Sequence, residues 1–177
     1  MIEQDRSVPL TELPAWVVWL SIVLMIVPVV PFALLSGIDS VWNEGIGWWL
    51  LPAMLVLIVV HEAVHAIAWK FASGLPWKAF RFGVVWKALA PYCHATEMMR
   101  VQPYRIGAVA PLIVTGVLPL IYGYVAWSAA WVVLGAVAIS AAVGDIFVLW
   151  VLRDLPDEAL VRDHPSNAGC IVLLPEE

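Results

Sequence analysis

Long uncharged stretches dominate the pattern of hydrophobic and polar positions along the chain. Ala15–Ser36 carries no charged residue, a second apolar run extends from Trp48 to Trp69, and Ile106–Gly144 is again uncharged. Tryptophans lie near both ends of the second run, so we expect Trp48 and Trp69 at the membrane interface. Roughly 20 helical residues cross the hydrocarbon core of a bilayer. The third stretch would rise roughly 58 Å as one helix, about twice that core, so it must fold back, and WSAAW at residues 127–131 supplies the turn. The pattern predicts four membrane-spanning helices, over about residues 15–36, 48–70, 106–126 and 131–152.

The segment between the second and third spans has a different pattern. AFRFGVVWK alternates aromatic and polar residues, and PYCHATEMM follows after a short break, which predicts a β-hairpin over about residues 77–101. The expected fold is a mostly α membrane protein of about four transmembrane helices, with a β-hairpin inserted between helices 2 and 3. We expect a single integral membrane domain over residues 1–177. Its polar C-terminal tail, residues 153–177, is expected to lie outside the core from Ala159 onward and to be partly disordered.

Composition supports this class of protein. The chain is 63% hydrophobic and 13% charged, with a mean hydropathy of +0.91, whereas soluble domains are about one quarter charged. The net charge of −5 and the lack of a basic stripe argue against a nucleic-acid partner. Cys93 and Cys170 lie far apart without CxxC spacing, so they indicate neither a disulfide framework nor a zinc ribbon.

The basic residues predict the orientation in the membrane. With four spans, all nine Lys and Arg fall on one side of the bilayer and none on the other. Basic loops stay in the cytoplasm. We therefore expect a multi-pass protein of the cell membrane whose termini, hairpin and active-site opening face the cytoplasm.

The second span contains titratable residues that are costly in a bilayer. His61, Glu62 and His65 form HEAVH, an instance of HExxH. Positions i and i+4 share one face of a helix, so both imidazoles can bind one metal ion while the glutamate reaches a water molecule on it. The bare motif occurs by chance on soluble helices, and a lone histidine on an apolar face is usually a core residue. Three such groups within a span indicate function, with a proton relay or a polar packing contact as the alternative.

A catalytic zinc site needs a third protein ligand. Asp145 is the acidic residue embedded in the fourth span. Counted from Lys70, His65 is five residues away and His61 nine, roughly 7 and 14 Å of helix rise. Asp145 is eight residues from Arg153, roughly 12 Å, so the three candidates share one layer of the bilayer, nearer the cytoplasm. The structural alternative is that Asp145 caps or hydrogen-bonds a neighbouring helix, with Gly144 allowing close packing.

These segments together resemble the putative zincin peptidase family of small membrane proteins. The resemblance rests on HEAVHA in the inner half of a span, the β-hairpin after it, YRIGAVAPLIV at the entry to the next span, and a later Gly-Asp. That family is itself similar to the site-2 protease class of intramembrane metalloproteases. The resemblance implies His61, His65 and Asp145 as zinc ligands and Glu62 as the catalytic glutamate. Site-2 proteases carry their aspartate as Asp-Gly near an Asn-Pro, whereas this chain has the order Gly-Asp without a preceding Asn-Pro.

The expected function is zinc-dependent hydrolysis of peptide bonds in membrane-embedded or membrane-proximal substrates, with Zn²⁺ as cofactor. The alternatives are a non-catalytic membrane metal or haem carrier, a small transport component, and a pseudoprotease that binds helices without cutting. Cys93 and His94 are expected to have packing or surface roles, and His164 to be solvated. If Asp145 is not the third ligand, Glu97 or His94 is next in line.

Overall fold

The computed structural model describes residues 2–86 and 90–174. Lys87, one of the nine basic residues, and the last three residues of the tail lie outside this part. The chain divides into two compact units. The first comprises Met1–Pro14, Glu62–Ala110 and Gly144–Glu177, and the second comprises Ala15–His61 and Pro111–Val143. The prediction of one domain over residues 1–177 stays a prediction.

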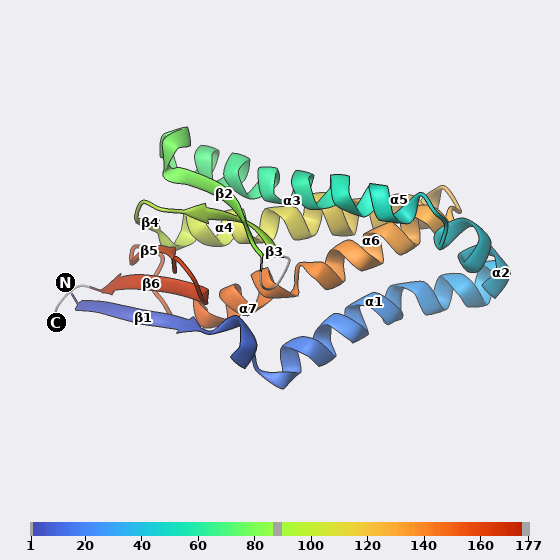
Figure 1. Cartoon of the computed structure of the whole chain (residues 1–177), viewed down its shortest axis with the longest axis horizontal. Helices are drawn as coiled ribbons and strands as arrows, with labels where there is room; N and C mark the ends of the chain where they lie inside the picture. The colour runs from blue at the N-terminus through green and yellow to red at the C-terminus, as the bar shows by residue number, and fades with distance from the viewer. Residues whose placement is uncertain (1, 87–89, 175–177) are drawn as a thin grey trace. The chain divides into compact units, whose positions relative to one another are not determined.

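The second unit is helical (Figure 1). Its elements are α1 (Ala15–Ser36), α2 (Ile38–Ser40), η2 (Val41–Gly45), the first half of α3 (Leu50–Ser73), η4 (Leu112–Val117), α5 (Leu118–Val125) and α6 (Ala129–Ala141). Glycines let α5 and α6 approach closely, because a Cβ at Gly123 or Gly135 would lie under 3 Å from the backbone of the facing helix. Small residues at helix contacts are typical of membrane proteins. Phe32 and Val132 are fully buried in the core of this unit.

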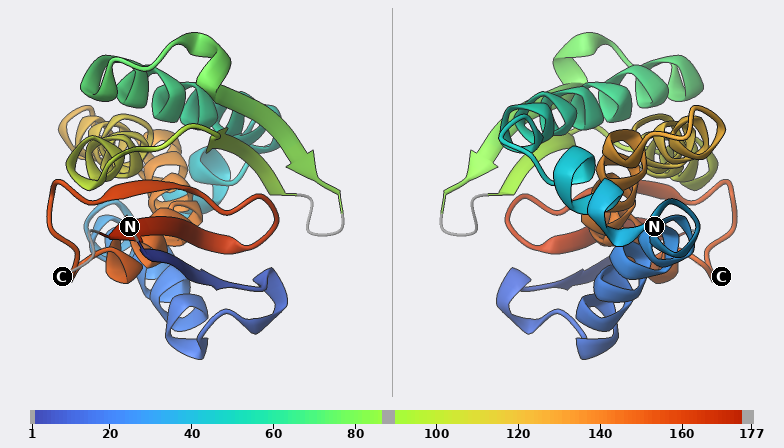
Figure 2. Two further views of the ribbon diagram at one scale, coloured as in Figure 1. Left: turned by 90° about the vertical axis from the view of Figure 1, so that its left-hand side faces the viewer. Right: turned by 90° about the vertical axis from the view of Figure 1, so that its right-hand side faces the viewer.

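The first unit combines helix ends with two antiparallel sheets. Its elements are β1 (Ile2–Val8), η1 (Leu10–Glu12), the second half of α3, η3 (Trp77–Ala79), β2 (Phe80–Val85), β3 (Ala90–Ala95), β4 (Met99–Arg100), α4 (Val101–Pro111), α7 (Val143–Val151), β5 (Leu160–Asp163) and β6 (Ala168–Leu174). The hairpin β2–β3 forms one sheet, and β1-β6-β5-β4 form the other. Figure 2 shows β1 beside the C-terminal strands, so the two ends of the chain share a sheet.

The predicted fold class is confirmed. Among the described residues, four helices are long and apolar enough to cross a membrane, and they run over Ala15–Ser36, Leu50–Ser73, Val101–Val125 and Ala129–Val151. The reversal falls within WSAAW as expected, at Trp127, whose φ is 55°. The hairpin lies inside the predicted range, with Phe82 opposite Cys93.

The expectation for the C-terminal tail was wrong. Val161, Cys170 and Val172 are fully buried in the core of the first unit. The segment Ala168–Leu174 is apolar enough to form a sheet interior, and its partner β1 begins at the other end of the sequence. Sequence patterns along the chain do not reveal a pairing over such a separation.

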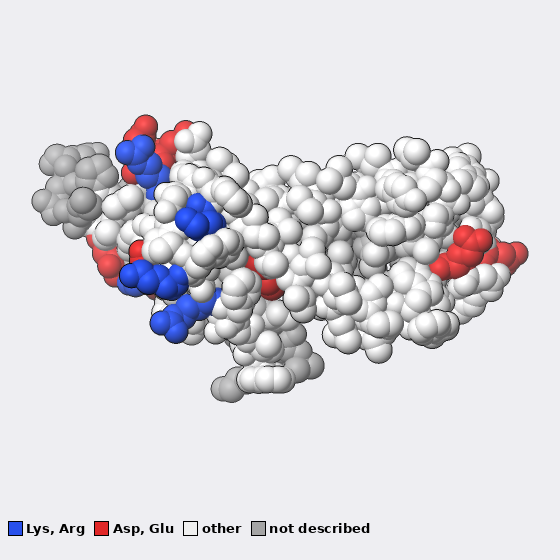
Figure 3. All heavy atoms as spheres, turned by 90° about the horizontal axis from the view of Figure 1, so that it is seen from above, with Lys and Arg blue, Asp and Glu red and all other residues white. Residues whose placement is uncertain are grey.

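The charged residues are distributed unevenly between the two units. All nine Lys and Arg fall in the sequence ranges of the first unit, whereas Asp39 and Glu44 are the only Asp, Glu, Lys or Arg of the second. The space-filling view in Figure 3 shows blue basic side chains on the first unit, whereas most of the surface of the second unit is white. An uncharged helical surface is what lipid chains require.

Candidate metal centre

The two histidines of the HEAVH motif lie one turn apart on α3. Because α3 is one continuous helix, its own geometry places His61 and His65 on the same face. His65 is 5% exposed, and His61 is partly buried. The helix therefore presents two imidazoles from an apolar span, as the motif predicts.

The His65 ring is held on both nitrogens. Its Nδ1 lies 2.9 Å from the carbonyl oxygen of Gly107, which can only accept a hydrogen bond. Nδ1 therefore carries the proton, and Nε2 faces the Oδ1 atom of Asp145 at 3.1 Å. An unprotonated nitrogen and a carboxylate oxygen both offer lone pairs, so a proton or a cation must lie between them.

The His61 ring has the same arrangement within the second unit. The Thr115 hydroxyl donates its hydrogen to the carbonyl oxygen of Pro111 at 2.7 Å, so toward His61 it accepts. His61 Nδ1, 3.3 Å from that hydroxyl, is then the donor, which leaves Nε2 as the unprotonated nitrogen. Thr115 belongs to the π-helical turn η4, and such turns are frequent at functional sites.

The donor set fits a zinc ion. The possible ligand atoms of His61, His65 and Asp145 all lie within 4.8 Å of one another. Two atoms bound to one tetrahedral zinc at about 2.0–2.2 Å lie roughly 3.3 Å apart, close to the 3.1 Å between His65 and Asp145. Hydrogen bonds from the second ring nitrogen of each histidine are the usual support of metal-ligating imidazoles. Two histidines and a carboxylate are also a donor set of catalytic zinc sites.

A cavity of about 200 Å³ within the first unit opens onto His65 and Asp145. Glu62, His65 and Asp145 line it from the helices, and four consecutive residues of the hairpin, residues 91–94, line it from β3. The connection between β5 and β6 forms a further part of the wall. The cavity is therefore lined by the Glu62 carboxylate, which is separate from the metal-ligand candidates.

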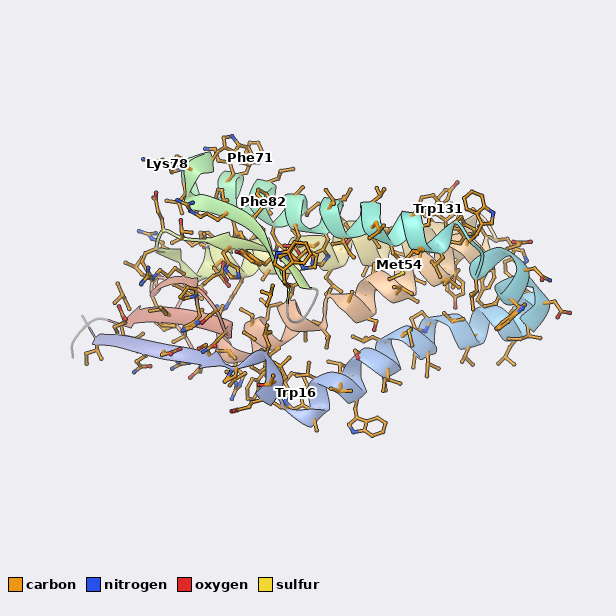
Figure 4. The ribbon with its side chains drawn as sticks, viewed as in Figure 1. Trp16, Met54, Phe71, Lys78, Phe82 and Trp131 are labelled. Atoms are coloured by element: carbon orange, nitrogen blue, oxygen red, sulfur yellow. The ribbon has the colours of Figure 1, made fainter. Side chains whose placement is uncertain are left out.

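Trp69 has a role that sequence reasoning missed. It was expected to lie at the membrane interface, but it is 3% exposed and stacks on the ring of His65, with centroids 5.0 Å apart. Its Nε1 donates to the carbonyl oxygen of Tyr104 at 3.0 Å. By contrast, Trp131 at the start of α6 is exposed and projects outward (Figure 4). The position of Trp69 one turn after His65 was the available signal.

Asp163 is a second acidic residue that the sequence did not single out. It lies at the end of β5 and lines the same cavity as Glu62. It accepts hydrogen bonds from the Tyr104 hydroxyl and, at 2.6 Å, from the backbone N–H of Ala95. Burial raises the pKa of Asp163 to about 6, although both hydrogen bonds act in the opposite direction.

The remaining polar candidates lie as follows. Cys93 is buried, and burial raises the pKa of its thiol to about 12, so it stays protonated. His94 stacks on Tyr92 with centroids 4.0 Å apart, and burial lowers its pKa. Glu97 is exposed and lies outside the residues that line the cavity. The prediction that His164 is solvated was wrong, because its side chain is only 15% exposed and its Nδ1 accepts backbone hydrogen bonds within its own turn.

Comparison with known proteins places the chain in a family. The sequence matches the family described as "Putative zincin peptidase" over residues 54–160, more than half of the chain. The chain belongs to this family. The matched range contains the HEAVH motif, the hairpin and Asp145, and zinc is the metal that a zincin family implies. The description of the family is that of a metallopeptidase.

One relative comes from Pyrococcus woesei and carries the description "Uncharacterized 24.7 kDa protein in gap 5'region". The two sequences are 27% identical over 117 residues, which is 65% of this chain. The match spans about half the length of that relative. No solved structure matches the chain.

Proposed function

We propose that this member of the zincin peptidase family is a zinc-dependent intramembrane metalloprotease, similar to site-2 proteases. The observation that carries the proposal is the state of the two imidazoles. Both Nδ1 atoms lie within hydrogen-bond distance of an acceptor, so in each ring Nε2 is the nitrogen whose lone pair can bind a metal ion, and that of His65 faces a carboxylate at 3.1 Å. A packing contact or a hydrogen-bonded core pair would not require this matched orientation.

The proposed reaction is hydrolysis of a peptide bond. When bound, zinc lowers the pKa of water toward about 7 and polarises the scissile carbonyl. Glu62 takes the proton of the attacking water and returns it to the leaving amine, a role worth roughly 10²–10⁴-fold in rate. Trp69 and Gly107 hold the His65 ring from its face and its edge. We assign peptide hydrolysis because the family is described as a peptidase and because Glu62 is present, whereas metal binding alone would not require this glutamate.

The location of the motif indicates the class of substrate. His61, Glu62 and His65 lie within a candidate membrane span, and Asp145 lies within another. The reacting bond must therefore come from a membrane-embedded or membrane-proximal segment. A helical segment hides its carbonyls in hydrogen bonds, so it must first unwind, and a strand edge of the hairpin can hold it in extended form.

The charge distribution supports an orientation with both termini and the cavity on the cytoplasmic side of the cell membrane. All nine basic residues belong to the first unit, which also contains the cavity and both ends of the chain. Basic segments near span ends remain in the cytoplasm.

The experiment that tests the function compares wild type with Glu62→Gln. The variant is nearly isosteric, so we expect it to keep zinc while it loses cleavage. Substrates would be found as membrane proteins that are shortened in cells with the wild-type protein and intact in cells with Glu62→Gln. Identical membrane proteomes with both proteins would contradict the proposal, and a Soret band in the purified protein would assign haem binding instead.

A further inference from the structure

The outer edge of β3 faces the catalytic cavity. Residues 91–94 are consecutive, and their side chains alternate between the two faces of the strand, yet all four line the cavity. Side chains on opposite faces can share one cavity only along the edge of the strand. Among the described residues, β3 pairs with β2 alone, so its other edge has no partner strand.

Alternation along β3 shows which backbone groups lie on this edge. The N–H of Ala95 donates to Asp163, whereas the N–H of Thr96 donates to Ala79 next to β2. Backbone groups of successive strand residues point to opposite sides. Pro91, Cys93 and Ala95 therefore direct their backbone groups away from β2. Pro91 is consistent with this assignment, because a proline has no N–H and is tolerated in a strand where that N–H would not pair with the neighbouring strand.

Few backbone donors remain for a partner on this edge. Pro91 has no N–H, and the N–H of Ala95 is occupied by the Asp163 carboxylate at 2.6 Å. In the described part of β3, Cys93 is then the one outward residue with both an N–H and a C=O for pairing. Its side chain packs against Ala66, the residue after His65. Phe82, which lies opposite Cys93 on β2, is labelled in Figure 4.

We propose that Asp163 is a positioning residue that fixes the register of an extended substrate on β3. Its carboxylate oxygen takes the place that a substrate carbonyl would take at Ala95, so pairing stops at Cys93, beside the helix turn that carries Glu62 and His65. Asp163 is suited to this role because it is partly buried and held by the Tyr104 hydroxyl and by the pairing of β5 with β6. This inference rests on the proposed proteolytic function.

Removal of the Asp163 carboxylate should allow a second register of the substrate on β3. Backbone pairing repeats every two residues, about 7 Å along a strand. In Asp163→Ala the N–H of Ala95 becomes available, and a substrate can bind in a second register shifted by two residues. We expect a second cleaved bond two residues from the first. A residue that only stabilised the fold would change the amount of product but not its ends.

The test uses detergent-purified full-length protein and a defined library of 14-residue peptides. The probe is a peptide that the wild type cuts at one bond, with products identified by mass spectrometry. Asp163→Asn and Tyr104→Phe keep an acceptor at Ala95 and should retain the single bond. Asp163→Ala leaves the buried Tyr104 hydroxyl without its acceptor, which destabilises the fold. The double variant Asp163→Leu/Tyr104→Phe removes both partners of this hydrogen bond, so it tests the same register without an unpaired hydroxyl. If both Asp163→Ala and the double variant still cleave the peptide at the same single bond, Asp163 does not fix the register of the substrate.

A second pair of variants tests the edge itself. Cys93→Pro removes the outward N–H without touching the ladder to β2, and Cys93→Ala is the matched control that keeps it. We expect KM to rise roughly two- to tenfold for Cys93→Pro relative to Cys93→Ala, as for one lost hydrogen bond, with zinc content equal in the two. Equal KM values would contradict pairing at Cys93.

Binding can be separated from cutting. In the Glu62→Gln background, peptides with a photoreactive residue at successive positions are cross-linked and the adducts mapped. When Asp163→Ala is added, the peptide position that cross-links to β3 should move by two residues, or a second cross-linking position should appear two residues away. If the wild type cleaves no peptide but this shift is seen, the proposed proteolytic function is wrong, and the proposal that Asp163 fixes the register of a bound peptide is supported. If no position cross-links to β3, substrate pairing on β3 is refuted.

Discussion

The substitution Gly107→Ala tests whether packing around Trp69 holds the metal centre. A Cβ at position 107 would lie 2.1 Å from both Cδ1 and Nε1 of Trp69, where ordinary contacts are 3.4–4 Å. Trp69 would have to withdraw by more than 1 Å. That movement breaks its hydrogen bond to Tyr104 and its stacking on His65, whose Nδ1 donates to the backbone of the substituted residue.

The magnitude follows from these contacts. Overpacking of a buried site costs typically about 1–3 kcal/mol, and a buried donor left without its acceptor costs about 1–3 kcal/mol. We therefore expect Gly107→Ala to lower the free energy of unfolding by roughly 2–6 kcal/mol and to reduce zinc occupancy. Both would be measured in detergent, by denaturant unfolding and by elemental analysis.

Two further variants make this prediction specific. A Cβ at Gly144, in α7 next to Asp145, meets no atom within 4 Å, so Gly144→Ala should leave stability unchanged or raise it by up to about 1 kcal/mol. Trp69→Leu provides room for the new methyl group, so the double variant Trp69→Leu/Gly107→Ala should be more stable than the sum of the single effects predicts, by about 0.5–3 kcal/mol. Wild-type stability and zinc content in Gly107→Ala would refute the idea that this contact sets the His65 ring.

Three other predictions concern the acidic residues and the orientation. Asp145→Ala should lower zinc occupancy as well as activity, and full retention of both would make Asp145 a packing residue. For Asp163, the folded-state pKa of about 6 lies above the ordinary 3.8, so stability is lost as the pH rises from 4 to 6 and the carboxyl group ionises more readily in the unfolded chain. In chelator-treated protein, the unfolding free energy of Asp163→Asn minus that of wild type should increase by about 2 kcal/mol between pH 4 and pH 7, and a pH-independent difference would contradict this. Single-cysteine labels at Arg6 and Arg162 should react only from the cytoplasmic side and a label at Asp39 only from outside, so the opposite pattern would overturn the orientation.

The spans and the histidine motif could be predicted because both depend on local sequence. An uncharged run of sufficient length has few alternatives to a membrane helix, and i, i+4 spacing places His61 and His65 on one face whatever surrounds them. Asp145 could be selected by depth, because few acidic residues lie within spans. The structure brings Asp145 to His65 within the first unit, as this reasoning expected.

Other parts of the site depend on contacts between distant residues. Asp163 is the last residue of a short strand in a polar segment, and nothing local distinguishes it from the solvated acids nearby. Its burial arises because β5 packs beside β6, and its hydrogen-bond partners Tyr104 and Ala95 lie 59 and 68 residues away. Trp69 was misassigned for a different reason: a tryptophan near a span end fits both the interface and a site, and composition alone cannot separate the two.

The central claim is that the three ligand candidates hold one zinc ion and that Glu62 uses it for hydrolysis. The most direct measurement is zinc per chain beside cleavage activity for wild type, His61→Ala/His65→Ala and Glu62→Gln. We predict about one zinc and activity in wild type, neither in the double variant, and zinc without activity in Glu62→Gln. Full zinc content in the double variant, or wild-type cleavage by Glu62→Gln, would contradict the account.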